Sequence, residues 1–193
     1  MLIRGYLLIA LASGALASTA RAETTEPASA ESTVYALVGN QINSGKLFQL
    51  TAGPNVALGL RWRAIPKSGN WGATWDMFAS ASQGYSALNQ TSYQPDTELS
   101  IASVGWATGV CYLNSVVDVC PLLTLQTFQV NELKNHFAYW SLGYGLELDK
   151  SFGSYRYMLR ATEANLGHKI AGILESGKFR TVSFGVGYLL GDK

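Results

Sequence analysis

The sequence predicts an all-β fold, a closed antiparallel barrel of about eight strands in up-and-down order. First, apolar residues alternate with small or polar residues in one segment after another, which is the period of a half-buried β-strand. Second, stretches rich in turn residues separate these segments. Third, only 14% of the residues are charged and 48% are hydrophobic, whereas an ordinary soluble domain has about 25% charged residues. A water-facing surface built from this chain would be unusually poor in charge.

The first 22 residues are expected to be a cleavable signal peptide. Arg4 supplies the positive start, an apolar stretch runs from Tyr6 to Ala17, and Ala20-Arg21-Ala22 has the small-x-small cleavage pattern. The apolar stretch is too short for a membrane-spanning helix, which needs about 20 residues. We therefore expect cleavage after Ala22, a flexible lead-in over residues 23–32 and the barrel over residues 33–193.

The strands are predicted from the alternation along the chain. It is clearest in five segments: residues 56–64, 71–79, 138–148, 155–161 and 181–190. It is less regular in three more: residues 34–41, 102–112 and 122–130. The turn-like residues Pro66 to Asn70 join the first two clear strands as a tight hairpin, and Ser151 to Ser154 form a second short turn.

The connections are expected to alternate in length. Long ones are predicted at residues 42–55, 81–98 and 162–178, a medium one at 113–119 and a short one at 131–135. Long loops on one side and short turns on the other are typical of outer-membrane barrels. Within the last long connection, residues 165–175 are compatible with two structures, a short helix or an extended continuation of the flanking strands.

The two faces of the predicted strands differ in chemistry. One is apolar, and the other carries Gly, Ser and Thr with six charged residues: Arg61, Arg63, Asp76, Glu147, Arg156 and Arg160. Such a face suits the crowded lumen of an eight-stranded barrel, where we expect the arginines to pair with the two carboxylates. The apolar face would then contact lipid, with Trp62, Trp71 and Tyr155 at the membrane boundary. The alternative is a soluble sheet with these charges in water.

Cys111 and Cys120 are the only cysteines and lie at the two ends of a predicted hairpin. The signal peptide would send them to an oxidising compartment. We therefore expect a structural disulfide that closes the turn between them; two unpaired thiols are the alternative.

The last predicted strand carries the most specific motif. Ser183, Gly185, Tyr188 and Leu190 resemble the terminal insertion signal of the small OmpA-like outer-membrane barrel proteins of Gram-negative bacteria, which the chain resembles over residues 32–190. The resemblance implies an eight-stranded barrel in the outer membrane, inserted by the barrel-assembly machinery and surrounded by outer-membrane lipid and lipopolysaccharide.

Some small barrels of this kind are lipid A deacylases or palmitoyltransferases, so both histidines are candidate catalytic residues. The deacylases place His and Ser two positions apart, whereas Phe137-Ala138 follow His136 and Lys169-Ile170 follow His168. No phosphate-binding glycine motif, metal-ligand cluster or nucleophile elbow is present in the sequence. We therefore predict no catalytic residue, metal or cofactor.

The predicted function is structural or one of surface interaction, through long extracellular loops on a barrel whose lumen is plugged by side chains. Without the signal peptide, acidic residues outnumber basic ones by one, which argues against nucleic acid as a partner. An extracellular protein partner stays open. The alternatives are a lipid-modifying membrane enzyme and a periplasmic soluble β-barrel that binds an apolar ligand.

Overall fold

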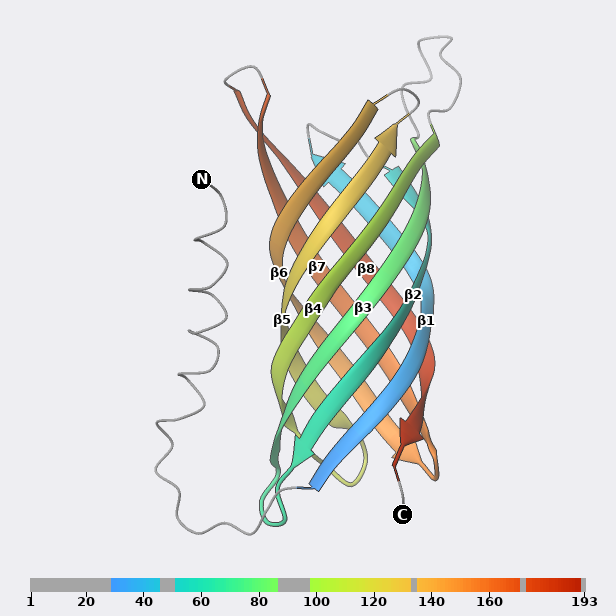
Figure 1. Cartoon of the computed structure of the whole chain (residues 1–193), viewed down its shortest axis with the longest axis vertical. Helices are drawn as coiled ribbons and strands as arrows, with labels where there is room; N and C mark the ends of the chain where they lie inside the picture. The colour runs from blue at the N-terminus through green and yellow to red at the C-terminus, as the bar shows by residue number, and fades with distance from the viewer. Residues whose placement is uncertain (1–28, 46–50, 87–97, 133–134, 171–172, 192–193) are drawn as a thin grey trace.

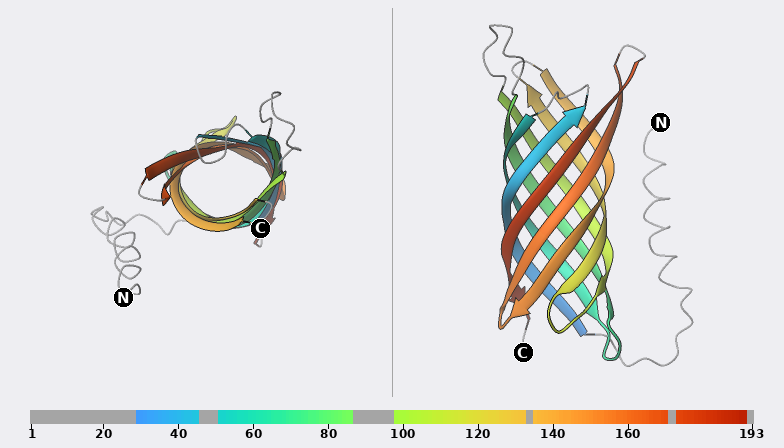
Figure 2. Two further views of the ribbon diagram at one scale, coloured as in Figure 1. Left: turned by 90° about the horizontal axis from the view of Figure 1, so that it is seen from above. Right: turned by 180° about the vertical axis from the view of Figure 1, so that it is seen from behind.

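The chain forms a closed barrel of eight antiparallel strands, in a computed structural model that describes residues 29–45, 51–86, 98–132, 135–170 and 173–191. The strands are β1 (Ser29–Gly45), β2 (Thr51–Ile65), β3 (Trp71–Ser86), β4 (Glu98–Tyr112), β5 (Asp118–Glu132), β6 (Asn135–Phe152), β7 (Tyr155–Ile170) and β8 (Ile173–Leu190). Each strand pairs with the next, and β1 pairs with β8 to close the ring (Figures 1 and 2). The predicted fold class is confirmed. The expected signal peptide lies outside the described residues.

The two ends of the barrel differ (Figure 1). We call the end that holds the β2–β3, β4–β5 and β6–β7 connections the turn end, and the opposite end the loop end. At the turn end, Gly69 and Gly153 adopt φ angles of 97° and 61°. A residue with a Cβ rarely adopts these left-handed conformations, so glycine permits the two tight turns. Both chain termini of the barrel also lie at the turn end (Figure 1).

The strands extend further than the alternation predicts. β7 and β8 remain paired to Ile170 and Ile173, so the predicted long loop at residues 162–178 is wrong. The helical alternative for residues 165–175 is also wrong, and the extended alternative is correct. This hairpin projects at the loop end (Figures 1 and 2). At Glu163, Lys178 and Arg180 the outward side chains are charged, so the contrast between the two faces is lost there while the backbone pairing continues.

The first connection is shorter than predicted as well. β1 continues to Gly45 and β2 begins at Thr51, so most of the predicted loop at residues 42–55 is strand. β1 also begins at Ser29, which places the last four residues of the expected lead-in in the barrel wall. Within the described residues, no helix is long and apolar enough to cross a membrane.

The apolar face of each strand points outward. Leu58 of β2 is 61% exposed and Val104 of β4 is 59% exposed, whereas Arg61 is fully buried in the lumen. Aromatic side chains pack in pairs on the outer wall near the turn end. The ring centroids of Trp62 and Trp75 lie 4.8 Å apart, those of Trp71 and Tyr112 5.2 Å, and those of Tyr155 and Tyr188 5.7 Å. We call these six residues the aromatic belt.

Candidate functional site

Four charged side chains meet at the centre of the lumen. Arg61 Nε donates to Asp76 Oδ1 at 2.7 Å, and Arg61 Nη2 donates to Glu147 Oε2 at 2.7 Å. Arg160 Nε donates to the same oxygen of Glu147 at 2.7 Å, and Arg160 Nη2 also bonds Asp76. Arg61, Asp76 and Glu147 are fully buried. Two guanidinium groups and two carboxylates thus form a closed, neutral set, in which each arginine contacts both acids.

The strand register brings these groups together. Arg61 lies directly opposite Asp76 in the β2–β3 pair, and Glu147 lies directly opposite Arg160 in the β6–β7 pair. Side chains opposite each other on one face of an antiparallel pair are close enough to interact. Because β2–β3 and β6–β7 lie on opposite sides of the ring, the two pairs face each other across the lumen.

A second layer of charges lies closer to the turn end. Arg63 Nη2 donates to Asp149 Oδ2 at 2.5 Å, and Arg63 Nη1 donates to Asp118 Oδ2 at 3.1 Å. Arg156 lies 3.3 Å from Asp149 Oδ1 and also pairs with Glu31. We call both layers together the lumen plug: Arg61, Arg63, Asp76, Asp118, Glu147, Asp149, Arg156 and Arg160, with Glu31 at its edge. Buried charges are costly unless paired, and here every one has an opposite partner.

Tyr35 of β1 caps the central set. Its hydroxyl accepts a hydrogen bond from Arg160 Nη1 at 3.1 Å and donates one to Asp76 Oδ2 at 3.4 Å. The Arg160 guanidinium carbon also lies 5.1 Å from the centre of its ring, within the range of a cation–π contact. Gly59 makes room for the ring, because a Cβ there would lie 2.4 Å from the Tyr35 hydroxyl oxygen.

The structure thus brings all six predicted lumen charges together, but sequence reasoning missed several of their partners. Asp149 follows Glu147 by two positions and therefore lies on the same face of the strand. Extending the predicted alternation past Leu148 would have placed Asp149 in the lumen. Asp118 falls in the predicted medium connection, and Glu31 in the expected lead-in. Tyr35 lies in a strand whose alternation is irregular.

Cys111 of β4 and Cys120 of β5 are joined in a disulfide, as expected. Both are fully buried and pack with Leu122. Arg63 Nη2 donates to the Cys120 sulfur at 3.2 Å. The disulfide therefore lies inside the lumen as part of the wall around the plug, rather than only at the tip of a turn.

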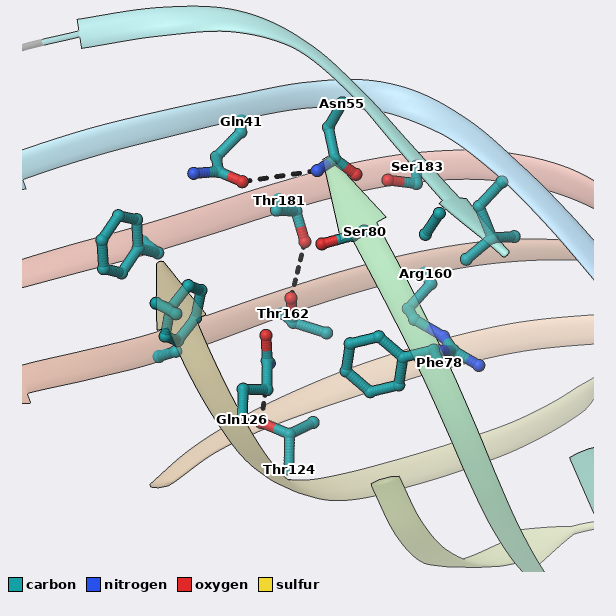
Figure 3. A pocket seen from close by; sticks show the side chains of 15 residues that line it. Gln41, Asn55, Phe78, Ser80, Thr124, Gln126, Arg160, Thr162, Thr181 and Ser183 are labelled. Carbon is teal, nitrogen blue, oxygen red and sulfur yellow. Dashed lines mark hydrogen bonds between the residues drawn. The ribbon is translucent and has the colours of Figure 1, made fainter. Parts of the chain in front are cut away.

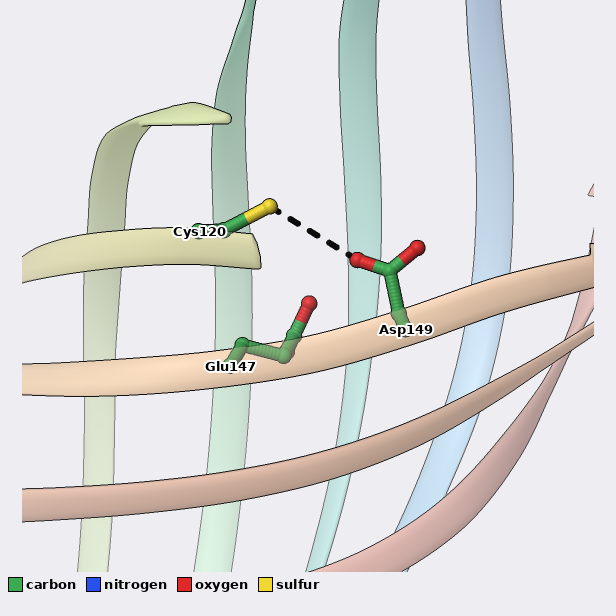
Figure 4. Close-up of side chains that lie close together, drawn as sticks. All are labelled: Cys120, Glu147 and Asp149. Atoms are coloured by element: carbon green, nitrogen blue, oxygen red, sulfur yellow. Dashed lines mark hydrogen bonds between the residues drawn. The ribbon is translucent and has the colours of Figure 1, made fainter. Parts of the chain in front are cut away.

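Cys120, Glu147 and Asp149 point toward one another in the plug (Figure 4), with ligand atoms within 4.8 Å of one another. This resembles a metal-ligand set in geometry only. The Cys120 sulfur is held in the disulfide, so it is not the thiolate that binds metals. Glu147 and Asp149 are already bonded to arginines. These three residues do not fit a metal ion.

Between the plug and the loop end the lumen contains a cavity of about 40 Å3 (Figure 3). That is room for a few water molecules. Its polar lining is largely paired within itself: Thr162 and Thr181 hydroxyl oxygens lie 2.6 Å apart, and Gln126 Nε2 donates to Thr124 Oγ1 at 3.3 Å. The lining also includes Phe128 and Phe179, whose rings stack with centroids 4.6 Å apart. The cavity is small and its polar lining groups hydrogen-bond to one another, so it is a poor candidate for a ligand site.

The remaining predicted residues are placed as follows. His136 lies in β6 opposite Asn131, and His168 lies in β7 opposite Glu175, rather than in the predicted loop. Of the predicted insertion signal, Ser183 is buried on the lumen side, and Tyr188 and Leu190 are exposed on the outer wall. Gly185 closely approaches β1, because a Cβ there would lie 2.0 Å from the carbonyl oxygen of Ala36.

Comparison with known proteins identifies the fold but no family. No family model and no curated protein matches the chain. Among solved structures, Neisserial surface protein A (NspA) matches with a TM-score of 0.56 and 14% identity, over 83% of this chain and 98% of that one. Ail, the attachment invasion locus protein of Yersinia pestis, in complex with the heparin analogue sucrose octasulfate, matches with a TM-score of 0.52 and 13% identity, over 83% and 99%. The chain therefore has the fold of eight-stranded outer-membrane β-barrels.

Proposed function

We propose that this protein is a bacterial outer-membrane barrel with a structural or surface-interaction role, its lumen closed by the plug. The observation that carries the proposal is the segregation of its side chains. Large apolar residues cover the outer wall, and the arginines and carboxylates of the plug lie inside. In water this arrangement is unfavourable, since the exposed apolar surface would have no apolar neighbour. In a bilayer the same wall contacts hydrocarbon, and a closed barrel leaves no backbone group unpaired.

The aromatic belt supports an orientation. Trp and Tyr favour the membrane–water interface because their rings are apolar and their polar atoms can reach water. Because the aromatic belt lies near the turn end, the short turns would lie at one membrane–water interface. Outer-membrane barrels have short turns in the periplasm and longer connections outside, so the loop end, with the projecting β7–β8 hairpin, would face the exterior.

The plug supports a role other than a pore. A lumen crossed by ion pairs leaves little room for a continuous water path, and the cavity beyond it has room for only a few water molecules. Binding would then depend on the loop end. Ser183, Gly185, Tyr188 and Leu190 would serve in recognition by the barrel-assembly machinery, and lipopolysaccharide would surround the barrel at the outer leaflet.

The decisive experiment is membrane fractionation combined with heat-modifiable gel mobility of the full-length chain. We expect recovery in the outer membrane, loss of the signal peptide after Ala22, and a shift in mobility between boiled and unboiled samples. Protease added to intact cells should cleave within the loop end. A soluble periplasmic protein without a heat shift would overturn the proposal and favour a soluble ligand-binding barrel. Hydrolysis or acyl transfer on purified lipid A, lost on replacing His136 or His168, would favour the enzyme alternative.

A further inference from the structure

Three charged side chains form a cluster on the outer wall of the β7–β8 hairpin. Glu163 of β7 lies directly opposite Arg180 of β8. Arg180 Nε donates to Glu163 Oε2 at 2.7 Å, and Lys178 Nζ lies 3.2 Å from Glu163 Oε1. We call Glu163, Lys178 and Arg180 the wall cluster. Its three residues have the outward parity of their strands, so they are separate from the lumen plug.

The wall cluster begins where the apolar wall of these two strands ends. Toward the turn end the outward residues are apolar or aromatic: Tyr155, Tyr157, Leu159 and Ala161 on β7, and Val182, Phe184, Val186, Tyr188 and Leu190 on β8. Among the strand residues whose side chains the structure describes, the only other charged residue with outward parity is Lys150, at the turn end. Outward charge is thus concentrated at one place, on the loop-end side of the apolar band.

The wall cluster carries a surplus of positive charge. Two cations share one carboxylate, and the cations are the accessible members. The side chains of Arg180 and Lys178 are 52% and 49% exposed, whereas that of Glu163 is 15% exposed. A guanidinium has five N–H donors and an ammonium three, and Glu163 occupies only part of them. The carboxylate therefore orients two cations that keep donors for an external anion.

We propose that Lys178 and Arg180 bind the phosphate group of an outer-leaflet lipid whose acyl chains lie along the adjacent apolar wall at Val182 and Phe184. The inference rests on the proposed membrane location. Arginine matches the geometry of phosphate oxygens, and lysine binds them as a point charge. Cations immediately beside an apolar surface match a molecule with a phosphate joined to hydrocarbon, which is the chemistry of lipid A. A soluble anion would contact the cations but would make no use of the apolar wall beside them.

The test compares lipid A with dephosphorylated lipid A of the same acyl chains, bound to the full chain folded in neutral detergent micelles. Each cation near an anionic lipid contributes about fivefold in affinity, so the wild-type protein should prefer the phosphorylated lipid by about 30-fold. The double variant Lys178→Gln, Arg180→Gln should lose that preference. Lys67→Gln, which removes one cation from the β2–β3 turn at the other end, should keep it. Glu163→Gln should keep or strengthen it, because both cations remain.

Equal binding of the two lipids by the wild-type protein would overturn the inference, and so would an unchanged preference in the double variant. A third outcome is that sucrose octasulfate binds to the same cations and the protein shows no preference for phosphorylated lipid. That outcome would overturn the inference and assign the wall cluster to soluble polyanions instead. The heat shift in gel mobility, measured on each variant, shows that the barrel is folded. A wild-type chain that shifts normally but lacks the preference overturns this inference alone, whereas a chain found soluble in the periplasm overturns the proposed function too.

Discussion

Arg61 of β2 and Glu147 of β6 are separated by half the ring of strands, and yet their side chains meet, with 2.7 Å between Arg61 Nη2 and Glu147 Oε2. The contact spans the lumen from wall to wall. The contact is possible because the long side chains of Arg61 and Arg160 reach the barrel axis from opposite sides. Both arginines bond the same two carboxylates, those of Asp76 and Glu147. Stability and permeability of the barrel should therefore depend on the same few side chains.

Glu147→Gln should destabilise the folded barrel strongly. The substitution leaves Arg61 and Arg160 buried with one carboxylate fewer, and breaking a buried ion pair from one side costs about 3–5 kcal/mol. Urea unfolding in lipid vesicles measures the change in the free energy of unfolding. Lys67→Gln, in an exposed turn outside the lumen, should change it by less than about 0.5 kcal/mol. A loss below about 1 kcal/mol for Glu147→Gln would contradict the structural role of the plug.

The wild-type protein should show no steady large conductance in a planar bilayer. The sixfold variant that replaces Arg61, Arg63, Asp76, Glu147, Asp149 and Arg160 by Ser removes the ion pairs that cross the lumen in both layers and preserves charge balance, since three cations and three carboxylates are removed together. It should therefore open a conducting path. The control Leu58→Ala, Leu60→Ala truncates two side chains on the outer wall and should stay closed. Large steady conductance of the wild-type barrel would disprove the plug.

Leu58→Arg tests which face contacts lipid. Leu58 is at the middle of β2 and points outward. Arginine at the midplane of a bilayer costs about 2–4 kcal/mol in a membrane barrel, and about 0–1 kcal/mol near an interface. Ala52→Arg, on the same face near the loop end, should therefore cost much less. Unfolding in vesicles gives both values, and equal small effects would reverse the assignment of the outer wall.

Removing the disulfide should weaken the barrel without changing its topology. Cys111 and Cys120 are separated by nine positions, and a loop of this size contributes roughly 2–3 kcal/mol in the chain-entropy model. The double variant Cys111→Ser, Cys120→Ser should lose about that much in urea unfolding and retain the heat shift in gel mobility. Reductant should have no further effect on this variant. Loss of the heat shift would instead mean that the disulfide is required for the fold.

The alternation of residues predicts most of the fold because one strand face must be apolar and the other must fill a narrow lumen. It fails at the loop ends of the strands. At Glu163 and Arg180 the outward residues are charged, as the lumen residues are. A prediction that relies on a difference in polarity between the two faces therefore ends these strands too early. Hydrogen bonding between β7 and β8 does not depend on that contrast and continues to Ile170 and Ile173.

The sequence also predicts only part of the candidate site, again because the alternation is unclear at the strand ends. Arg61, Arg63 and Arg160 lie within regular alternation, so their lumen position follows from parity. Asp118 and Glu31 lie at strand ends, where the sequence resembles a turn or a lead-in, and only the closed ring brings them beside arginines. Contacts across the lumen depend on the number of strands and their tilt, which the alternation of a single strand does not specify.

The direct cross-strand pairing of Arg61 with Asp76 and of Glu147 with Arg160 has a consequence for assembly. Each pair belongs to one hairpin of neighbouring strands, joined by a short turn, and can form before the ring closes. In the proposed membrane location each hairpin would enter the lipid with its central charges already matched, which would lower the desolvation cost of insertion. In the closed ring each arginine keeps its cross-strand partner and also contacts the second carboxylate across the lumen, so closure between β1 and β8 would join two neutral halves rather than bring together unmatched charges.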